Sequence, residues 1–335
     1  MFISPLRRLV PISGRVSGLS APVNTVAPAI TGTLEVGSVL TTTTGTWTNT
    51  PSSYSYQWKR GATNIGANQN TYTQVGADLG NNITCTVTAT NAAGSNSQVS
   101  NTVVTIFNRL SYGLKWAVDT DNKTEVATTT TLVDYFGNNS LANAAAAQQP
   151  ATVAAQFGAK SILRFTTDDI LTKTVANWFA GDTNGQITLV VKQNSTTQQS
   201  LFSSCDNLTT RLWIIRKAAT ANKLEHFHNS GDTTSSTIIG TQDLGTSLFK
   251  VITIASNGTT DKMYVNGVAE TISTGTLGGK WLADFPTQRD NISLGGVITN
   301  TIYYGNSDIY GAYYGAFNET NILNLHANLM AIGGL

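Results

Sequence analysis

The sequence predicts an all-β protein, and its residue pattern and its composition both favour that fold class. Short stretches of alternating apolar and polar residues recur along the chain, separated by turn residues about every 8–12 positions, as is typical of β-sandwiches. Charged residues make up only 12% of the 335 residues, and Thr, Asn, Ser and Gly take their place. Hydrophobic residues account for 40%, which is enough for two or three domain cores.

Residues 1–22 are expected to form an extended arm, because three prolines and two glycines oppose a helix there. Apolar side chains of this arm would fill pockets on a partner, and its arginines would pair with carboxylates. The candidate anchoring residues are Phe2, Ile3, Leu6, Arg7, Arg8 and Arg15. The alternative for this segment is a solvated tail.

Residues 23–106 are predicted to form a first domain of short strands, including strands at 36–41 and 54–59. From Ile83 to Thr90 the apolar residues Ile83, Cys85, Val87 and Ala89 alternate with threonines. This pattern predicts a strand with one face in a core and one in water.

This segment resembles the immunoglobulin-like repeats of bacterial surface proteins and phage structural proteins. The matching stretches are Gly45-Thr46-Trp47, Tyr56-Gln57-Trp58-Lys59-Arg60-Gly61 and the spaced residues from Asp78 to Gly94. The resemblance implies that Trp58 packs between two sheets. Leu40 stands where a bridging cysteine would be needed, so Cys85 is expected to be a small buried hydrophobe. Cys205 is predicted to lie in the second domain, which argues against a disulfide framework.

Residues 107–335 are predicted to form one longer all-β domain. Its successive motifs include Leu114 to Asp119, Ser161 to Phe165, Ile187 to Val191 and Tyr264-Val265-Asn266-Gly267. The pair Asn266-Gly267 is the strongest local signal for a two-residue hairpin turn. In their order these motifs resemble the laminin G-like, concanavalin A-like jelly-roll superfamily, whose phage and bacterial members often serve as lectin-like or virion modules.

Two helices are expected in this domain. Asn318 would cap a C-terminal helix in which Ile322, Leu325 and Leu329 keep helical spacing and which ends at Gly333-Gly334. A second, short helix is expected from Leu141 to Gln148.

Enzymatic activity is not expected, because a jelly-roll glycosidase needs two facing carboxylates and no such acid pattern occurs here. Surplus aromatic residues suggest glycan binding instead, since an exposed aromatic ring stacks on a sugar. The candidates are Trp178, Trp213, Trp281, Tyr303, Tyr304 and Tyr310. The alternative is that many of them fill the core.

No cofactor is expected, although calcium, which prefers several hard oxygen ligands, stays open. The calcium candidates are Asp119, Asp121, Asp168, Asp169 and Asp308, each of which is otherwise a turn former. His226 and His228 lie on one face of a predicted strand and are interpreted as residues of a solvated face rather than as metal ligands.

The favoured function is that of a non-enzymatic phage virion structural protein, either a capsid decoration or a fibre type. Other virion proteins would hold residues 1–22, and the jelly roll, present in many copies on the virion surface, would adhere weakly to host-surface polysaccharide. A net charge of +1 favours neither nucleic acid nor membrane as partner, and neither a signal peptide nor a membrane span is predicted. The alternative is a bacterial carbohydrate-binding surface module. A depolymerase would require paired acids.

Overall fold

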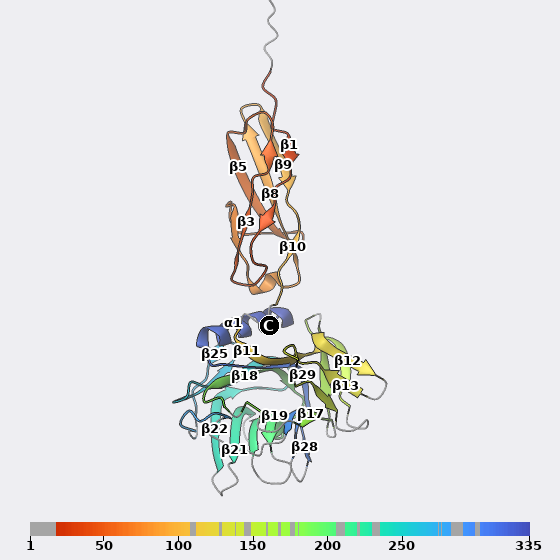
Figure 1. The fold of residues 1–335 in the computed structure, drawn as a ribbon, viewed down its shortest axis with the longest axis vertical. Coiled ribbons are helices and arrows are strands. Elements are labelled where there is room, and N and C mark those ends of the chain that lie inside the picture. Colours follow the sequence, from red (N-terminus) through yellow and green to blue (C-terminus); the bar gives the residue numbers. More distant parts are fainter. Residues whose placement is uncertain are drawn as a thin grey trace, which may run out of the picture. The chain divides into compact units, whose positions relative to one another are not determined.

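The computed structural model shows an all-β chain that divides into two compact units, Met1–Ile106 and Phe107–Leu335 (Figure 1). The described residues are 18–107, 112–126, 129–137, 139–143, 149–158, 160–166, 169–174, 178–179, 181–205, 212–219, 222–229, 235–273, 275, 277–282, 291–298 and 302–335. No helix in this described part has both the length and the apolar character needed to cross a membrane.

The first unit is a sandwich of small antiparallel sheets. Strand β8 is its centre, because it pairs with β5 on one edge and with β9 and β10 on the other. This sheet contains β5 (Ser53–Arg60), β6 (Thr63–Ile65), β8 (Asn82–Asn91), β9 (Gly94–Val99) and β10 (Val103–Val104). The other sheets contain β2 (Ile30–Thr31), β3 (Val39–Thr42) and β7 (Thr71–Thr73), and β1 (Asn24–Val26) with β4 (Thr46–Trp47).

The core of this unit lies between the two larger sheets, around Trp58. Its indole is fully buried, stacks on Tyr72 with ring centroids 5.5 Å apart, and donates Nε1–H to the Gln69 carbonyl at 2.9 Å. The alternation predicted for β8 is confirmed, because Ile83 and its three apolar partners are fully buried. Cys85 is a free buried thiol, as predicted, and burial raises its pKa to about 11.

The second unit consists of two large sheets. The eight-stranded sheet contains β11 (Leu114–Asp119), β15 (Ala151–Phe157), β16 (Lys160–Phe165), β18 (Gly185–Gln193), β23 (Lys250–Ser256), β24 (Asp261–Val265), β25 (Val268–Ala269) and β29 (Ser307–Gly315). The nine-stranded sheet contains β12 (Lys123–Val126), β13 (Thr129–Leu132), β14 (Leu141–Asn143), β17 (Leu171–Thr174), β19 (Gln199–Cys205), β20 (Leu212–Lys217), β21 (Lys223–Asn229), β22 (Ser235–Asp243) and β26 (Asn291–Leu294). A separate hairpin joins β27 (Gly296–Ile298) to β28 (Ile302–Tyr304).

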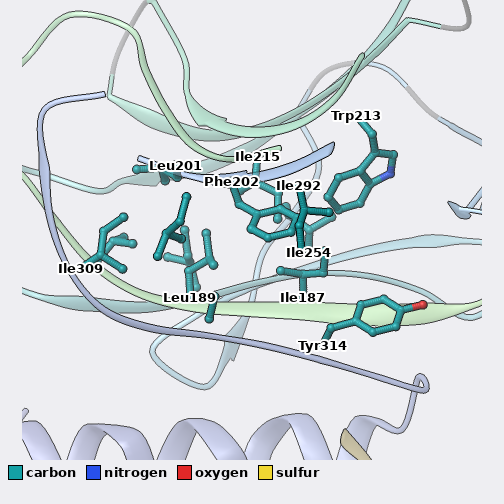
Figure 2. Close-up of a cluster of buried hydrophobic side chains, with 14 of the residues drawn as sticks. Ile187, Leu189, Leu201, Phe202, Trp213, Ile215, Ile254, Ile292, Ile309 and Tyr314 are labelled. Atoms are coloured by element: carbon teal, nitrogen blue, oxygen red, sulfur yellow. The ribbon is translucent and has the colours of Figure 1, made fainter. Parts of the chain in front are cut away.

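The two sheets face each other across the main core (Figure 2). The eight-stranded sheet contributes side chains such as Ile187 and Ile309, and the nine-stranded sheet contributes side chains such as Phe202 and Ile215. The alternation of each strand explains this arrangement, since every second residue points to the same face.

Helix α1 (Glu319–Gly333) covers the opposite face of the eight-stranded sheet, where Leu325 and Leu329 pack in one cluster with Val190 and Val251. His326 anchors the helix. Its Nδ1 accepts the Gly267 N–H at 2.7 Å, so Nε2 carries the proton and donates to Thr253 Oγ1 at 2.6 Å. Burial lowers the pKa of His326 to about 3.

The predicted hairpin and C-terminal helix are confirmed. Asn266 and Gly267 both adopt positive φ, at 49° and 77°, as a type I′ turn requires. Asn318 caps α1 by accepting the Asn321 N–H at 3.0 Å, and Gly334 ends it at φ 69°. The helix predicted from Leu141 is wrong at residues 141–143, which form β14, because pairing with β13 and β17 fixes them in a sheet. Residues 144–148 lie outside the described residues.

We expect Trp58→Ala to destabilise the first unit by about 3–5 kcal/mol, because it leaves a large cavity and an unpaired Gln69 carbonyl. Tyr54→Ala, on the same strand but 36% exposed, is the control and should cost less than about 1 kcal/mol. Chemical unfolding of the full chain with separate transitions for the two units measures both. Equal losses for the two variants would show that Trp58 is not a core residue.

We also expect the second unit to lose stability on mild acidification. Burial lowers the folded-state pKa of both His326 and His226 to about 3, whereas an unfolded histidine titrates near about 6.5. Stability is therefore complete above about pH 6.5 and falls as the pH drops towards about 3, because only the unfolded chain takes up protons.

When the pH falls from about 7.5 to about 5.5, each of these histidines should lower the free energy of unfolding of the second unit by about 1.4 kcal/mol. Denaturant unfolding at the two pH values measures this loss. His326→Gln keeps one donor and one acceptor and should remove about 1.4 kcal/mol of this pH dependence, the contribution of one histidine. An unchanged pH dependence in this variant would contradict the assignment.

Candidate functional site

Strand pairing gathers charged side chains at one end of the eight-stranded sheet. Asp308 on β29 lies between Arg164 on β16 and Lys192 on β18, which are its register partners on either side. The next row contains Ile309 and its partners, which face the core. Because side chains alternate along a strand, the charged row must point to the opposite face. We call Arg164, Lys192, Asn194 and Asp308 the rim cluster.

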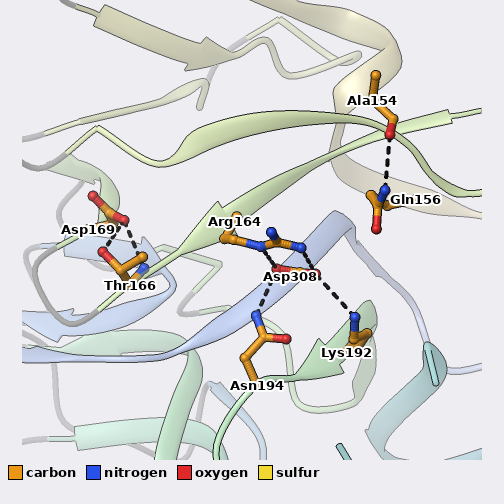
Figure 3. Close-up of polar contacts among 8 residues, drawn as sticks. All are labelled: Ala154, Gln156, Arg164, Thr166, Asp169, Lys192, Asn194 and Asp308. Atoms are coloured by element: carbon orange, nitrogen blue, oxygen red, sulfur yellow. Dashed lines mark hydrogen bonds and ion pairs between the residues drawn. The ribbon is translucent and has the colours of Figure 1, made fainter. Parts of the chain in front are cut away.

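The Asp308 carboxylate is the centre of this rim cluster (Figure 3). Arg164 donates Nε–H to Oδ1 and Nη2–H to Oδ2, both at 2.8 Å, which is a bidentate pair. Asn194 donates Nδ2–H to Oδ1 at 2.7 Å, and the Lys192 ammonium lies 3.6 Å from Oδ2. Asp308 is fully buried, whereas the Arg164 and Lys192 side chains are 39% and 23% exposed.

The rim cluster keeps its charges because each ion stabilises the other. Burial alone would raise the pKa of the Asp308 carboxyl, but the hydrogen bonds from Arg164 and Asn194 outweigh burial and lower it below its usual value. The hydrogen bond to Asp308 in turn raises the pKa of Arg164. The arrangement is therefore a pair of partly exposed cations with a buried counter-ion.

In the turn that follows β16, the Asp169 carboxylate stabilises the backbone by accepting hydrogen bonds. Asp169 accepts hydrogen bonds from the Thr166 N–H at 2.8 Å and the Thr166 hydroxyl at 2.7 Å (Figure 3). Asp169 is buried, so this carboxylate shapes the turn and does not face a ligand.

Four of the aromatic residues predicted to contact glycans are in fact buried, so that prediction is wrong for them. Trp178, Trp213 and Trp281 are at most 2% exposed and belong to the main core. Tyr310 faces the other side of its sheet and is fully buried, with its hydroxyl donating to Asp121 at 2.9 Å. The physical reason is that both faces of the eight-stranded sheet are covered. The second sheet packs on one face, where the tryptophans lie, and α1 packs on the other face, where Tyr310 lies. Tyr303 and Tyr304 belong to β28, but their side chains lie outside what the structure describes.

The calcium candidates are occupied by donors of the chain itself. Asp119 accepts the hydroxyls of Tyr135 at 2.8 Å and Tyr313 at 3.0 Å, and Asp121 pairs with Lys160 at 3.0 Å. Asp169 and Asp308 are held as described above, and Asp168 lies outside the described residues. In the part of the chain that is described, no group of three or more His, Cys, Asp or Glu side chains could hold a metal ion.

His226 and His228 share one face of β21, as predicted, but that face is buried rather than solvated. The His226 ring lies 4.5 Å from the Trp213 ring, and burial together with the nearby His228 lowers its pKa to about 3. These histidines face the interior because Leu224, two residues before His226, faces the core.

Sequence reasoning missed Arg164, Lys192 and Asn194 as site residues. Asp308 was singled out, but its partner Arg164 lies 144 positions away, so no local spacing connects them. The usable signal is a charged residue next to the apolar core residues of each of three strands: Arg164 after Leu163, Lys192 after Val191 and Asp308 before Ile309. The predicted anchoring residues Phe2, Ile3, Leu6, Arg7, Arg8 and Arg15 lie outside the described residues.

No protein-family model matches the sequence, and no curated protein matches it. Among solved structures, the chain is similar to the binding domain of botulinum neurotoxin DC in complex with rat synaptotagmin II, with 16% identity and a TM-score of 0.46. The match covers 65% of this chain and 52% of that one, so the chain spans about half the length of the neurotoxin domain.

Two sialidase structures are similar as well. The Ruminococcus gnavus sialidase CBM40 bound to alpha2,3 sialyllactose is 13% identical with a TM-score of 0.39, over 53% of this chain and 99% of that chain. The Trypanosoma rangeli sialidase in complex with 2,3-difluoro-KDN is 10% identical with a TM-score of 0.48, over 91% and 54%. Similarity at this level assigns no ligand, activity or partner to this chain.

Proposed function

We propose that the second unit is a non-catalytic, lectin-like domain that binds polysaccharide at the rim cluster. The observation that carries the proposal is the cluster itself: a guanidinium and an amide held by hydrogen bonds to a buried carboxylate, with an ammonium 3.6 Å from that carboxylate, and with the Arg164 and Lys192 side chains partly open to solvent. Pre-organised polar groups bind hydroxylated ligands without a further ordering cost. The jelly-roll resemblance of residues 107–335 favours the same function.

The buried aspartates of the described residues support a binding role over a hydrolytic one. The buried carboxylates Asp78, Asp119, Asp134, Asp169 and Asp308 each accept hydrogen bonds from side chains or backbone of the chain. A glycosidase needs a pair of carboxyl groups that face the substrate, one of them able to donate a proton. Carboxylates committed to internal hydrogen bonds are poorly suited to that role.

We further propose that the chain is a phage virion protein held in the particle through residues 1–22. The arginines and apolar residues of that segment and the two-domain resemblance support this proposal. A bacterial carbohydrate-binding surface module is the alternative, and both roles share the proposed binding domain.

We expect the full chain to bind polysaccharide on a glycan array without releasing new reducing ends. A single site should bind near millimolar, about 4 kcal/mol, and multivalent display should strengthen binding strongly. Asn194→Ala should weaken binding, because it removes the amide from the rim cluster together with one of the three hydrogen bonds that Asp308 accepts, whereas Asn184→Ala, at an exposed position in another loop, should not. Release of new reducing ends would show that the domain is an enzyme rather than a binding domain. A lack of binding to every glycan, even with multivalent display, would contradict the proposal.

We expect removal of residues 1–20 to leave both units folded but to abolish incorporation into virus particles. The described core of the first unit begins after this segment, at Ile30. The truncation removes the Ser20 carbonyl that accepts the Asn91 Nδ2–H at 2.8 Å, which should cost the first unit about 1 kcal/mol without unfolding it. Particle purification followed by protein detection measures incorporation. Normal incorporation of the truncated chain would contradict the anchoring role.

A further inference from the structure

The rim cluster carries more positive than negative charge. Arg164 and Lys192 flank a single carboxylate, Asp308, and the three form ion pairs at 2.8 and 3.6 Å. Asp308 already accepts two hydrogen bonds from Arg164 and one from Asn194. Because it is also fully buried, its negative charge cannot serve a ligand.

The groups that remain for a ligand are mainly donors. In the described contacts of Arg164, Nε and Nη2 bind Asp308, which leaves Nη1 without a protein acceptor. The Lys192 ammonium lies 3.6 Å from Asp308 Oδ2, beyond hydrogen-bond distance, so this contact commits none of its three N–H groups. Both side chains are partly exposed, so these donors can meet a ligand from solvent.

A hydroxyl group is both donor and acceptor, whereas a carboxylate or sulfate is only an acceptor and is negatively charged. The free donors and the net charge of the rim cluster therefore complement an anion better than a neutral hydroxyl. Geometry adds to this preference, because the bidentate contact with Asp308 fixes the guanidinium plane before any ligand arrives.

We propose that the rim cluster selects a negatively charged group on the polysaccharide, a carboxylate or a sulfate ester, and that Lys192 is the residue that determines this specificity. The inference rests on the proposed glycan-binding function and names its ligand class. Arg164 has two roles: its Nε–H and Nη2–H hold it against Asp308, and its Nη1–H groups can donate to the anionic group of the ligand.

The test compares three polymers with one backbone: dextran, carboxymethyl dextran and dextran sulfate. The full chain should bind at least one of the two anionic polymers about tenfold or more tightly than dextran, as expected of charge-assisted hydrogen bonds. The two anionic arms distinguish a carboxylate from a sulfate. Binding is measured by titration calorimetry and should weaken with added salt.

Lys192→Gln should remove most of this preference, and Lys192→Arg should retain it because the charge and donors persist. Lys173→Gln removes an equal charge from an exposed position on β17 and should change nothing. Thermal unfolding of each variant separates lost binding from lost folding.

Equal affinity for all three polymers would overturn the inference while leaving the proposed function intact, whereas a lack of binding to any glycan would overturn both. An equal loss in Lys173→Gln would show that general charge attraction, not the rim cluster, causes the binding.

Discussion

Strand β29 is the element on which the second unit depends. It pairs with β18 along one edge and with β16 and β11 along the other, and every one of its residues is buried. Asp308 and Tyr310 face one side and Ile309 the main core, and an irregularity in the pairing with β18 between Ile309 and Gly311 shifts the alternation, so that Tyr314 faces the main core as well. One strand therefore supplies the inner core, the surface under α1 and the buried acid of the rim cluster. A strand covered on both faces must bury apolar side chains or polar ones that are hydrogen-bonded, and β29 combines apolar residues with a hydrogen-bonded Asp308 and hydrogen-bonded tyrosine hydroxyls.

In this chain, which has few charged residues, buried aspartates hold turns in place by accepting hydrogen bonds. Asp78 fixes the turn before β8 by accepting from Arg60, Tyr72 and the Val75 N–H at 2.7–2.8 Å. Asp134 does the same with the backbone of its own turn, where it accepts the Phe136 N–H at 3.0 Å. Burying a carboxylate without partners would cost several kcal/mol, so a buried aspartate is stable only where hydrogen bonds offset the loss of its hydration. This use also explains why the calcium candidates within the described residues, Asp119, Asp121, Asp169 and Asp308, form no metal-binding group.

Local pattern predicted the parts of the fold that local forces decide. Period-two alternation predicted β8, the Asn266-Gly267 pair predicted the hairpin of β24 and β25, and capping residues predicted α1. Pattern does not tell whether the outer face of a sheet is covered, so it leaves Tyr310 open as either a surface or a core residue, whereas in the structure α1 helps to bury its face. The pairing of Arg164 with Asp308 was equally invisible, because it depends on β16 and β29 meeting across 144 residues.

The rim cluster and the strand register depend on the same interaction. Arg164 and Leu163 are consecutive on β16, and their register partners are Asp308 and Ile309. A slip of one residue would turn Arg164 into the core and Leu163 out of it, which would bury an unpaired charge and expose an apolar side chain. The bidentate pair therefore excludes the slipped arrangement, and the packed row beside it in turn holds the pair in place. The strands consequently fix the backbone positions of Arg164 and Lys192 on either side of Asp308, and the bidentate pair fixes the Arg164 guanidinium as well, which favours recognition of one kind of charged group.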